Sequence, residues 1–120
     1  MKTEYIQPNE NDKILFVNIN KTYVCKDKSS KDYRPSLYEA ARKYWKLSAD
    51  KIKNINLVVA HVNGIVKDVF IPTSWCRTDN AEYKGRLEFD GIEILNSEYI
   101  GKSILNLINL GQNPINYYNI

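Results

Sequence analysis

The pattern of apolar and polar positions is most distinctive over Leu57–Ile71, where two β-branched runs flank Asn63-Gly64. Asn-Gly is typical of a two-residue type I′ hairpin turn, because both central residues adopt positive φ. Nearly every position in the two runs is apolar, so we predict a central hairpin that is covered on both faces. We expect Pro72 to end the second strand, and the rest of the fold to be arranged around this hairpin.

Helical signals precede the hairpin. Ser36 and Glu39 form a Ser-x-x-Glu capping box directly after Pro35, and this pattern is typical of a helix N-terminus. Apolar residues at helical spacing then predict a main helix over residues 37–47. A second, short helical turn is expected over residues 49–54.

Strand-like segments lie on both sides of this central part. Alternating apolar positions predict strands over Lys13–Asn20 and Gly85–Ile94, and Thr22–Cys25 and Ile115–Ile120 are shorter β-prone pieces. In the alternation after Gly85 we expect Leu87 and Phe89 to face inward and Glu88 to face outward. Asp90-Gly91 predicts a second tight turn.

Together these elements predict one α+β domain. A chain of 120 residues is long enough for a single core. Short strands with frequent turn signals, interrupted by one main helix and one short helix, favour a small, strongly bent mixed sheet or a half-closed β-barrel. We assign residues 13–120 to this domain and expect residues 1–12 to form a loose N-terminal segment.

The composition adds a mild preference for phosphates. The net charge is +3, which permits contact with phosphate groups without requiring it. Nine tyrosines and two tryptophans indicate that some aromatic side chains line a surface or groove. The richness in Ile, Asn and Lys points to an AT-rich coding genome, bacterial or phage.

The chain gives no indication of secretion or membrane insertion. Cys25 and Cys76 lie far apart, which fits neither a disulfide scaffold nor a metal site. No apolar stretch resembles a signal peptide or reaches transmembrane length. We therefore expect a cytoplasmic protein with reduced thiols that does not associate with membranes.

Catalytic signatures are absent from the sequence. His61 lies within an apolar strand, where a packed core histidine is the expected role. Gly101-Lys102-Ser103 has the end of a phosphate-loop motif without its upstream glycine, and it predicts a turn. We expect no catalytic residue, no metal and no cofactor, and hence a binding module rather than an enzyme.

Two groups of aromatic and cationic residues are candidates for ligand binding. Tyr38, Arg42 and Trp45 form one stripe of the main helix, and a guanidinium between aromatic rings can stack on a base and contact a phosphate. The alternative is that Trp45 is core and Arg42 lies beside it. Trp75 and Arg77 form a second such pair after the hairpin, where a binding role and a structural role are equally expected.

An amide pair near the C-terminus is a third candidate. Gln112 and Asn113 precede Pro114, and their side-chain amides could hydrogen-bond a base edge. The alternative is a structural turn in which the asparagine side chain binds its own backbone.

Several segments resemble small bacterial domains of the PUA-like group, which includes the ASCH and EVE branches. The resemblance rests on a capped helix, a strand-Gly-strand run, Trp75 and three later segments, found at residues 36–45, 57–70, 88–92, 99–102 and 111–117. It implies a sheet that curls into a barrel. The signature residues of ASCH and EVE domains have no clear match, so the branch stays open.

The resemblance also implies a function. PUA-like domains typically bind RNA, modified DNA bases or nucleotides in an aromatic pocket with a basic rim, and the match places Arg42, Trp45, Trp75 and Arg77 near such a pocket. With the other candidates, the expected ligand-binding residues are Tyr38, Arg42, Trp45, Trp75, Arg77, Gln112 and Asn113.

Two other functions stay open. One is a protein-interaction domain or inhibitor, for instance a phage protein directed against a host defence system, with tyrosines as interface anchors. The other is a small nuclease or nucleotide hydrolase. It would need Asp68, Asp79, Asp90 and Glu93 to converge on a metal, for which the sequence gives no reason.

Overall fold

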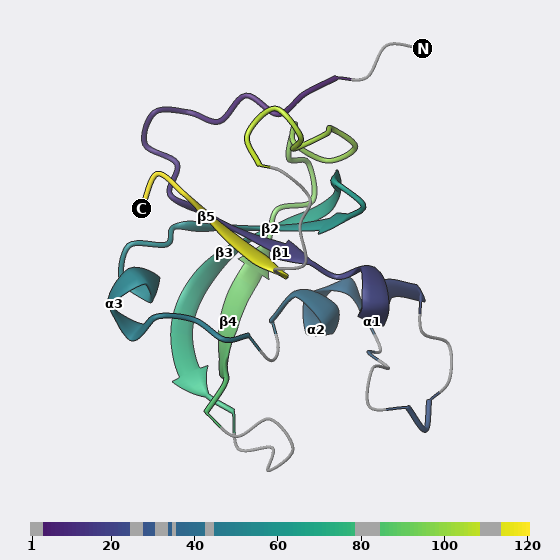
Figure 1. Cartoon of the computed structure of the whole chain (residues 1–120), viewed down its shortest axis with the longest axis vertical. Coiled ribbons are helices and arrows are strands. Elements are labelled where there is room, and N and C mark those ends of the chain that lie inside the picture. Colours follow the sequence, from purple (N-terminus) through teal and green to yellow (C-terminus); the bar gives the residue numbers. More distant parts are fainter. Residues whose placement is uncertain are drawn as a thin grey trace.

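The computed structural model describes residues 4–24, 28–30, 34, 36–42, 45–78, 85–108 and 114–120. Its strands are β1 Ile14–Asn18, β2 Leu57–Val62, β3 Ile65–Arg77, β4 Leu87–Glu93 and β5 Ile115–Tyr118, and its helices are α1 Asn20–Val24, α2 Leu37–Arg42 and α3 Ala49–Ile52. The strands form a sheet in the order β4-β3-β2-β1-β5 (Figure 1). β1 and β2 are parallel and the other neighbours are antiparallel. The α+β class and the mixed sheet are confirmed, but the sheet is open, with β4 and β5 at its two edges.

The central hairpin is confirmed. Asn63 and Gly64 have φ values of 51° and 86°, as the turn between β2 and β3 requires. The predicted end at Pro72 is wrong, because β3 continues to Arg77. Its register with β4 shifts between Pro72 and Ser74, and such an irregularity accommodates a residue without a backbone N–H. Figure 1 shows β3 curving strongly, so that its second half turns down with β4.

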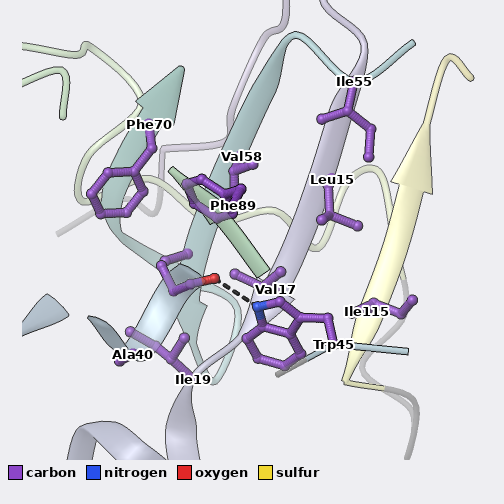
Figure 2. Packing of buried hydrophobic residues seen from close by; sticks show 12 residues of the cluster. Leu15, Val17, Ile19, Ala40, Trp45, Ile55, Val58, Phe70, Phe89 and Ile115 are labelled. Atoms are coloured by element: carbon purple, nitrogen blue, oxygen red, sulfur yellow. Dashed lines mark hydrogen bonds between the residues drawn. The ribbon is translucent and has the colours of Figure 1, made fainter. Parts of the chain in front are cut away.

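The sheet is covered on both faces (Figure 1). On the helix face, where α2 and α3 lie, Leu15, Val17, Val58 and Phe70 belong to a cluster of buried side chains (Figure 2). Residues 4–12 and 94–108 cover the other face, which we call the loop face. Its core cluster consists of Ile6, Ile14, Phe16, Leu57, Val59, Val66, Val69, Tyr99 and Ile104.

The N-terminal segment does not lie loose over its described residues 4–12. Ile6 is fully buried, and its N–H donates to the carbonyl of Ser103 at 2.9 Å. Ser103 in turn donates its N–H to the carbonyl of Glu4 at 2.8 Å. The segment is mostly polar, but Ile6 is buried, and its backbone hydrogen-bond partner Ser103 lies near the other end of the sequence.

The predicted β-prone piece at Thr22–Cys25 is instead part of α1, as far as Val24. The side chain of Asn18 accepts the N–H of Asn20 at 2.9 Å, a local bond that starts a turn. Thr22 Oγ1 then donates to the carbonyl of Ile19 at 3.2 Å.

No helix in the described ranges is long and apolar enough to cross a membrane.

The predicted turn at Asp90-Gly91 is also wrong, because β4 runs through both residues. A Cβ atom at Gly91 would lie 2.6 Å from the carbonyl oxygen of Ile71 on β3. Glycine at this position therefore reflects the close approach of two strands.

Candidate functional site

The side chains of Tyr38 and Arg42 bind the outer edge of β4. Arg42 Nε donates to the carbonyl of Phe89 at 2.8 Å, and the N–H of Gly91 donates to the hydroxyl of Tyr38 at 3.0 Å. An edge strand leaves such backbone groups without a strand partner. Tyr38 and Arg42, two of the predicted ligand-binding residues, therefore satisfy backbone groups at the exposed edge of β4.

Arg42 is surrounded by carboxylates. Its Nη1 lies 3.0 Å from Glu39, and its Nη2 lies 3.1 Å from Glu88 and 2.6 Å from Asp90. The Arg42 and Glu88 side chains are only 14% and 11% exposed, so the expectation that Glu88 faces outward is wrong.

This cluster opposes the binding of a phosphate at Arg42. Burial disfavours the charged guanidinium, but the hydrogen bonds and charges of Glu39 and Asp90 outweigh burial and raise the pKa of Arg42 above its ordinary value. Three carboxylates around one cation leave the cluster with a formal charge of −2. A phosphate would have to displace these carboxylates and would be repelled by them.

Trp45 belongs to the core of the helix face. Its side chain is 8% exposed, and its indole Nε1 donates to the carbonyl of Ala41 at 2.6 Å (Figure 2). In a continuing α-helix that carbonyl would accept the backbone N–H of Trp45. Here the backbone of Trp45 pairs instead with Leu87, at 3.0 and 2.9 Å. The prediction that the main helix reaches Leu47 is therefore wrong, and Trp45 fits the core alternative.

Trp75 and Arg77 lie on the second half of β3. The Trp75 ring is half-buried and packs against Phe89, with ring centroids 5.3 Å apart. Arg77 is exposed and pairs in register with Leu87. Since Leu87 also pairs with Trp45, the ends of three chain segments lie side by side.

This arrangement creates a basic end of the sheet, formed by Lys46, Arg77 and Arg86. The described residues 45–47, 75–78 and 85–87 include these three basic side chains, and the neighbouring Glu88, which pairs in register with Cys76, is bonded to Arg42. Neighbouring strands are about 4.8 Å apart, so the outer two segments lie within about 10 Å of each other. The sequence alone does not identify Lys46 as a candidate, because only the pairing of Trp45 and Arg77 with Leu87 brings the segment that carries Lys46 to this end of the sheet.

Gln112 and Asn113, the amide pair predicted to read a base edge, lie outside the described residues. Their roles therefore stay predictions.

Two of the four carboxylates considered for a hydrolase meet in the structure. Asp68 is 5% exposed, and the Glu93 carboxyl group lies close enough to affect its pKa. Burial, with this contact, raises the pKa of Asp68 to about 7. Asp90 is paired with Arg42, and Asp79 lies outside the described ranges. In the described part of the chain, His, Cys, Asp and Glu form no group that could hold a metal.

His61 is a core residue, as predicted. It is 1% exposed, and its Nδ1 accepts the N–H of Gly64 at 3.3 Å. Burial lowers the pKa of His61 to about 4, so the ring is neutral near neutral pH.

Asp68 and His61 should make the free energy of unfolding depend on pH in opposite directions. The folded-state pKa of Asp68 is raised from 3.8 to about 7, so its contribution to stability declines as the pH rises through that interval. The pKa of His61 is lowered from 6.5 to about 4, so its contribution declines as the pH falls. Asp68→Asn removes the first dependence and leaves that of His61. We therefore expect the melting temperature of Asp68→Asn to rise between pH 4 and 6.5, and that of the wild type to change less. Parallel profiles for the two proteins in thermal melts would contradict this assignment.

Comparisons with protein-family models, with curated proteins and with solved structures give no match.

Proposed function

We propose that the protein is a non-enzymatic, PUA-like module that binds nucleic acid or nucleotides, with the basic end of the sheet as its contact surface. The observation that carries this proposal is the register at this end of the sheet, where Arg77 pairs with Leu87 and Leu87 also pairs with Trp45, the residue before Lys46. Neither cation forms an ion pair with another described residue. Surfaces that bind single-stranded nucleic acid usually combine basic side chains, which contact the phosphates, with aromatic rings, on which bases stack.

This surface differs from the pocket expected from the sequence. Arg42 and Trp45 hold β4 in place, and β4 in turn pairs with the segment that carries Arg77. They would be positioning residues for the basic end. Trp75 would offer the exposed part of its ring to a base, while Arg77 and Lys46 would contact phosphates.

Removing Arg77 and Lys46 together should weaken nucleic-acid binding. Each phosphate that is no longer neutralised should lower the slope of log K against log salt by about 0.7 for a single strand, so Arg77→Ala with Lys46→Ala should lower it by about 1.4. Fluorescence anisotropy with labelled single-stranded DNA and RNA, measured over a salt series, gives this slope.

A charge-matched variant controls for the removal of two cations. Lys28→Ala with Lys53→Ala removes the same charge from exposed positions outside the basic end and should leave the slope nearly unchanged. Equal slopes for the two double variants, or no binding of any oligonucleotide or nucleotide by the wild type, would refute the proposed surface.

A protein-interaction function is a second candidate, and a separate observation favours it. Ile71 and Ile92 are 43% and 61% exposed and form a cross-strand pair on β3 and β4. Adjacent exposed apolar side chains on a sheet are typical of a docking surface. They lie on the loop face, whereas Trp75 lies on the helix face, so the two candidate functions can be tested independently.

A further inference from the structure

A hollow of about 250 Å³ opens on the loop face of the sheet. Its lining includes an apolar floor of Leu57, Val69 and Ile94 and a polar rim of Asp12, Glu98 and Tyr99. The floor comes from β2, from β3 and from the residue that follows β4. The hollow is therefore built on the sheet itself, with its rim supplied by the segments that cover this face.

Hydrogen bonds fix one side of the rim. Tyr99 donates its hydroxyl proton to Asp12 Oδ2 at 2.6 Å, and the N–H of Asn9 is 3.1 Å from the same oxygen. Burial, together with Asp12, raises the pKa of Tyr99 to about 12, so the phenol remains a donor at neutral pH. Asp12 is thus held in place at the mouth of the hollow.

The rim is acidic although the chain as a whole is basic. Asp12 and Glu98 are the charged residues among the lining side chains, and none of that lining is basic. The net charge of the whole chain is +3. The hollow would therefore attract a cationic group and repel a phosphate.

The apolar floor continues onto the exposed surface. Ile94 donates its N–H to the carbonyl of Val69 at 2.8 Å, and the next pair on the same face is Ile71 with Ile92. Residues two apart on a strand are about 7 Å apart and point the same way. Together these two pairs form an apolar shelf that begins in the hollow and ends at Ile71 and Ile92.

We propose that the hollow and the shelf bind an extended segment of a partner protein that carries an apolar residue and, two residues away, a lysine or arginine. Alternate side chains of such a segment match the spacing of the shelf. The apolar side chain would cover Ile71 and Ile92. The alkyl part of the basic side chain would lie on the floor, with its cation between Asp12 and Glu98. This inference rests on the second candidate function and uses no residue of the basic end.

Two synthetic peptides test the proposal, acetyl-Ser-Ile-Ser-Lys-Ser-amide and the same peptide with Glu in place of Lys. Titrated into ¹⁵N-labelled protein at millimolar concentration, the lysine peptide should shift the amide resonances of residues 92–99 saturably, and the glutamate peptide should not. Glu98→Gln should weaken the lysine peptide about two- to fivefold, as expected for one exposed ion pair. Ile92→Ser should weaken it as well. Asp50→Asn, a charge-matched change at an exposed residue of α3, should leave it unchanged.

The possible outcomes separate clearly. Equal binding of both peptides, or no saturable shift with either, would overturn the proposal. Shifts of the same amides by an oligonucleotide would assign the hollow to nucleic acid and would overturn it too. The dispersion of the spectra shows whether each variant is folded. Failure here leaves the salt-dependence experiment on Arg77 and Lys46 unaffected, because the two sites share no residue.

Discussion

Arg42→Ala is expected to lower the free energy of unfolding by about 3 kcal/mol, the lower end of the range for removing one partner of a buried ion pair, because the side chains of Arg42 and Glu39 are 14% and 22% exposed. The loss has two parts. Glu39 and Glu88 would keep their charges without the cation that lies within 3.1 Å of both, and the Phe89 carbonyl would lose its donor. Urea unfolding followed by circular dichroism measures the change.

Asp90→Asn is the control for this prediction. Asp90 is also bonded to Arg42, but its side chain is 60% exposed, so we expect a loss below about 1 kcal/mol. If the free energy of unfolding of Arg42→Ala instead lay within about 0.5 kcal/mol of the wild-type value, the guanidinium would not be needed to hold β4. The ligand-binding role inferred from the sequence would then regain support.

This expected instability affects how binding experiments are designed. A drop in nucleic-acid affinity for Arg42→Ala could reflect a disordered β4 rather than the removal of a phosphate-binding cation, because Arg42 holds the strand that pairs with the Arg77 segment. Arg77 is exposed, so its replacement should leave the fold intact. Arg77 and Lys46 therefore test the proposed surface more directly than Arg42 does.

The sequence predicts those parts of the fold that depend on local chemistry. Alternation assigns Ile14 and Phe16 to one face of β1 and Leu15 and Val17 to the other, as the two core clusters confirm. The Asn63-Gly64 turn follows from backbone preferences alone. Such signals need no knowledge of what lies across the sheet.

The errors arise where a distant partner decides the conformation. Gly91 has the signature of a turn, but the carbonyl of Ile71 requires glycine there. Trp45 lies in helical register, but Leu87 pairs with its backbone. Ile6 appears in a polar segment that only its contact with Ser103 identifies as docked. In each case the deciding atom is at least 20 positions away in the numbered sequence.

The same reasoning applies to the candidate site. An arginine between aromatic residues at helical spacing predicts a surface that contacts something. Whether the contact is a ligand or β4 depends on which strand lies at the edge of the sheet, and a single sequence does not give strand order. The sequence correctly indicates that Tyr38 and Arg42 form polar contacts, but both contact β4 of the same chain.

Trp45→Ala is expected to lower the free energy of unfolding by about 3–5 kcal/mol, because it leaves a large cavity in the core of the helix face. Trp45→Phe keeps most of the volume but removes the indole donor to the Ala41 carbonyl. An unsatisfied buried acceptor costs about 1–3 kcal/mol, so the phenylalanine variant should lie between alanine and the wild type. Chemical denaturation of the three proteins gives these differences.

Trp75→Phe provides both a control and a probe. Trp75 is half-buried, so its replacement should destabilise less than Trp45→Phe, and it leaves Trp45 as the only tryptophan of the chain. In that variant the fluorescence should be blue-shifted and resistant to acrylamide, because the remaining indole is 8% exposed. A red-shifted, readily quenched emission would place Trp45 at the surface. It would then be available to a ligand, and its assignment as the residue that ends α2 inside the core would fail.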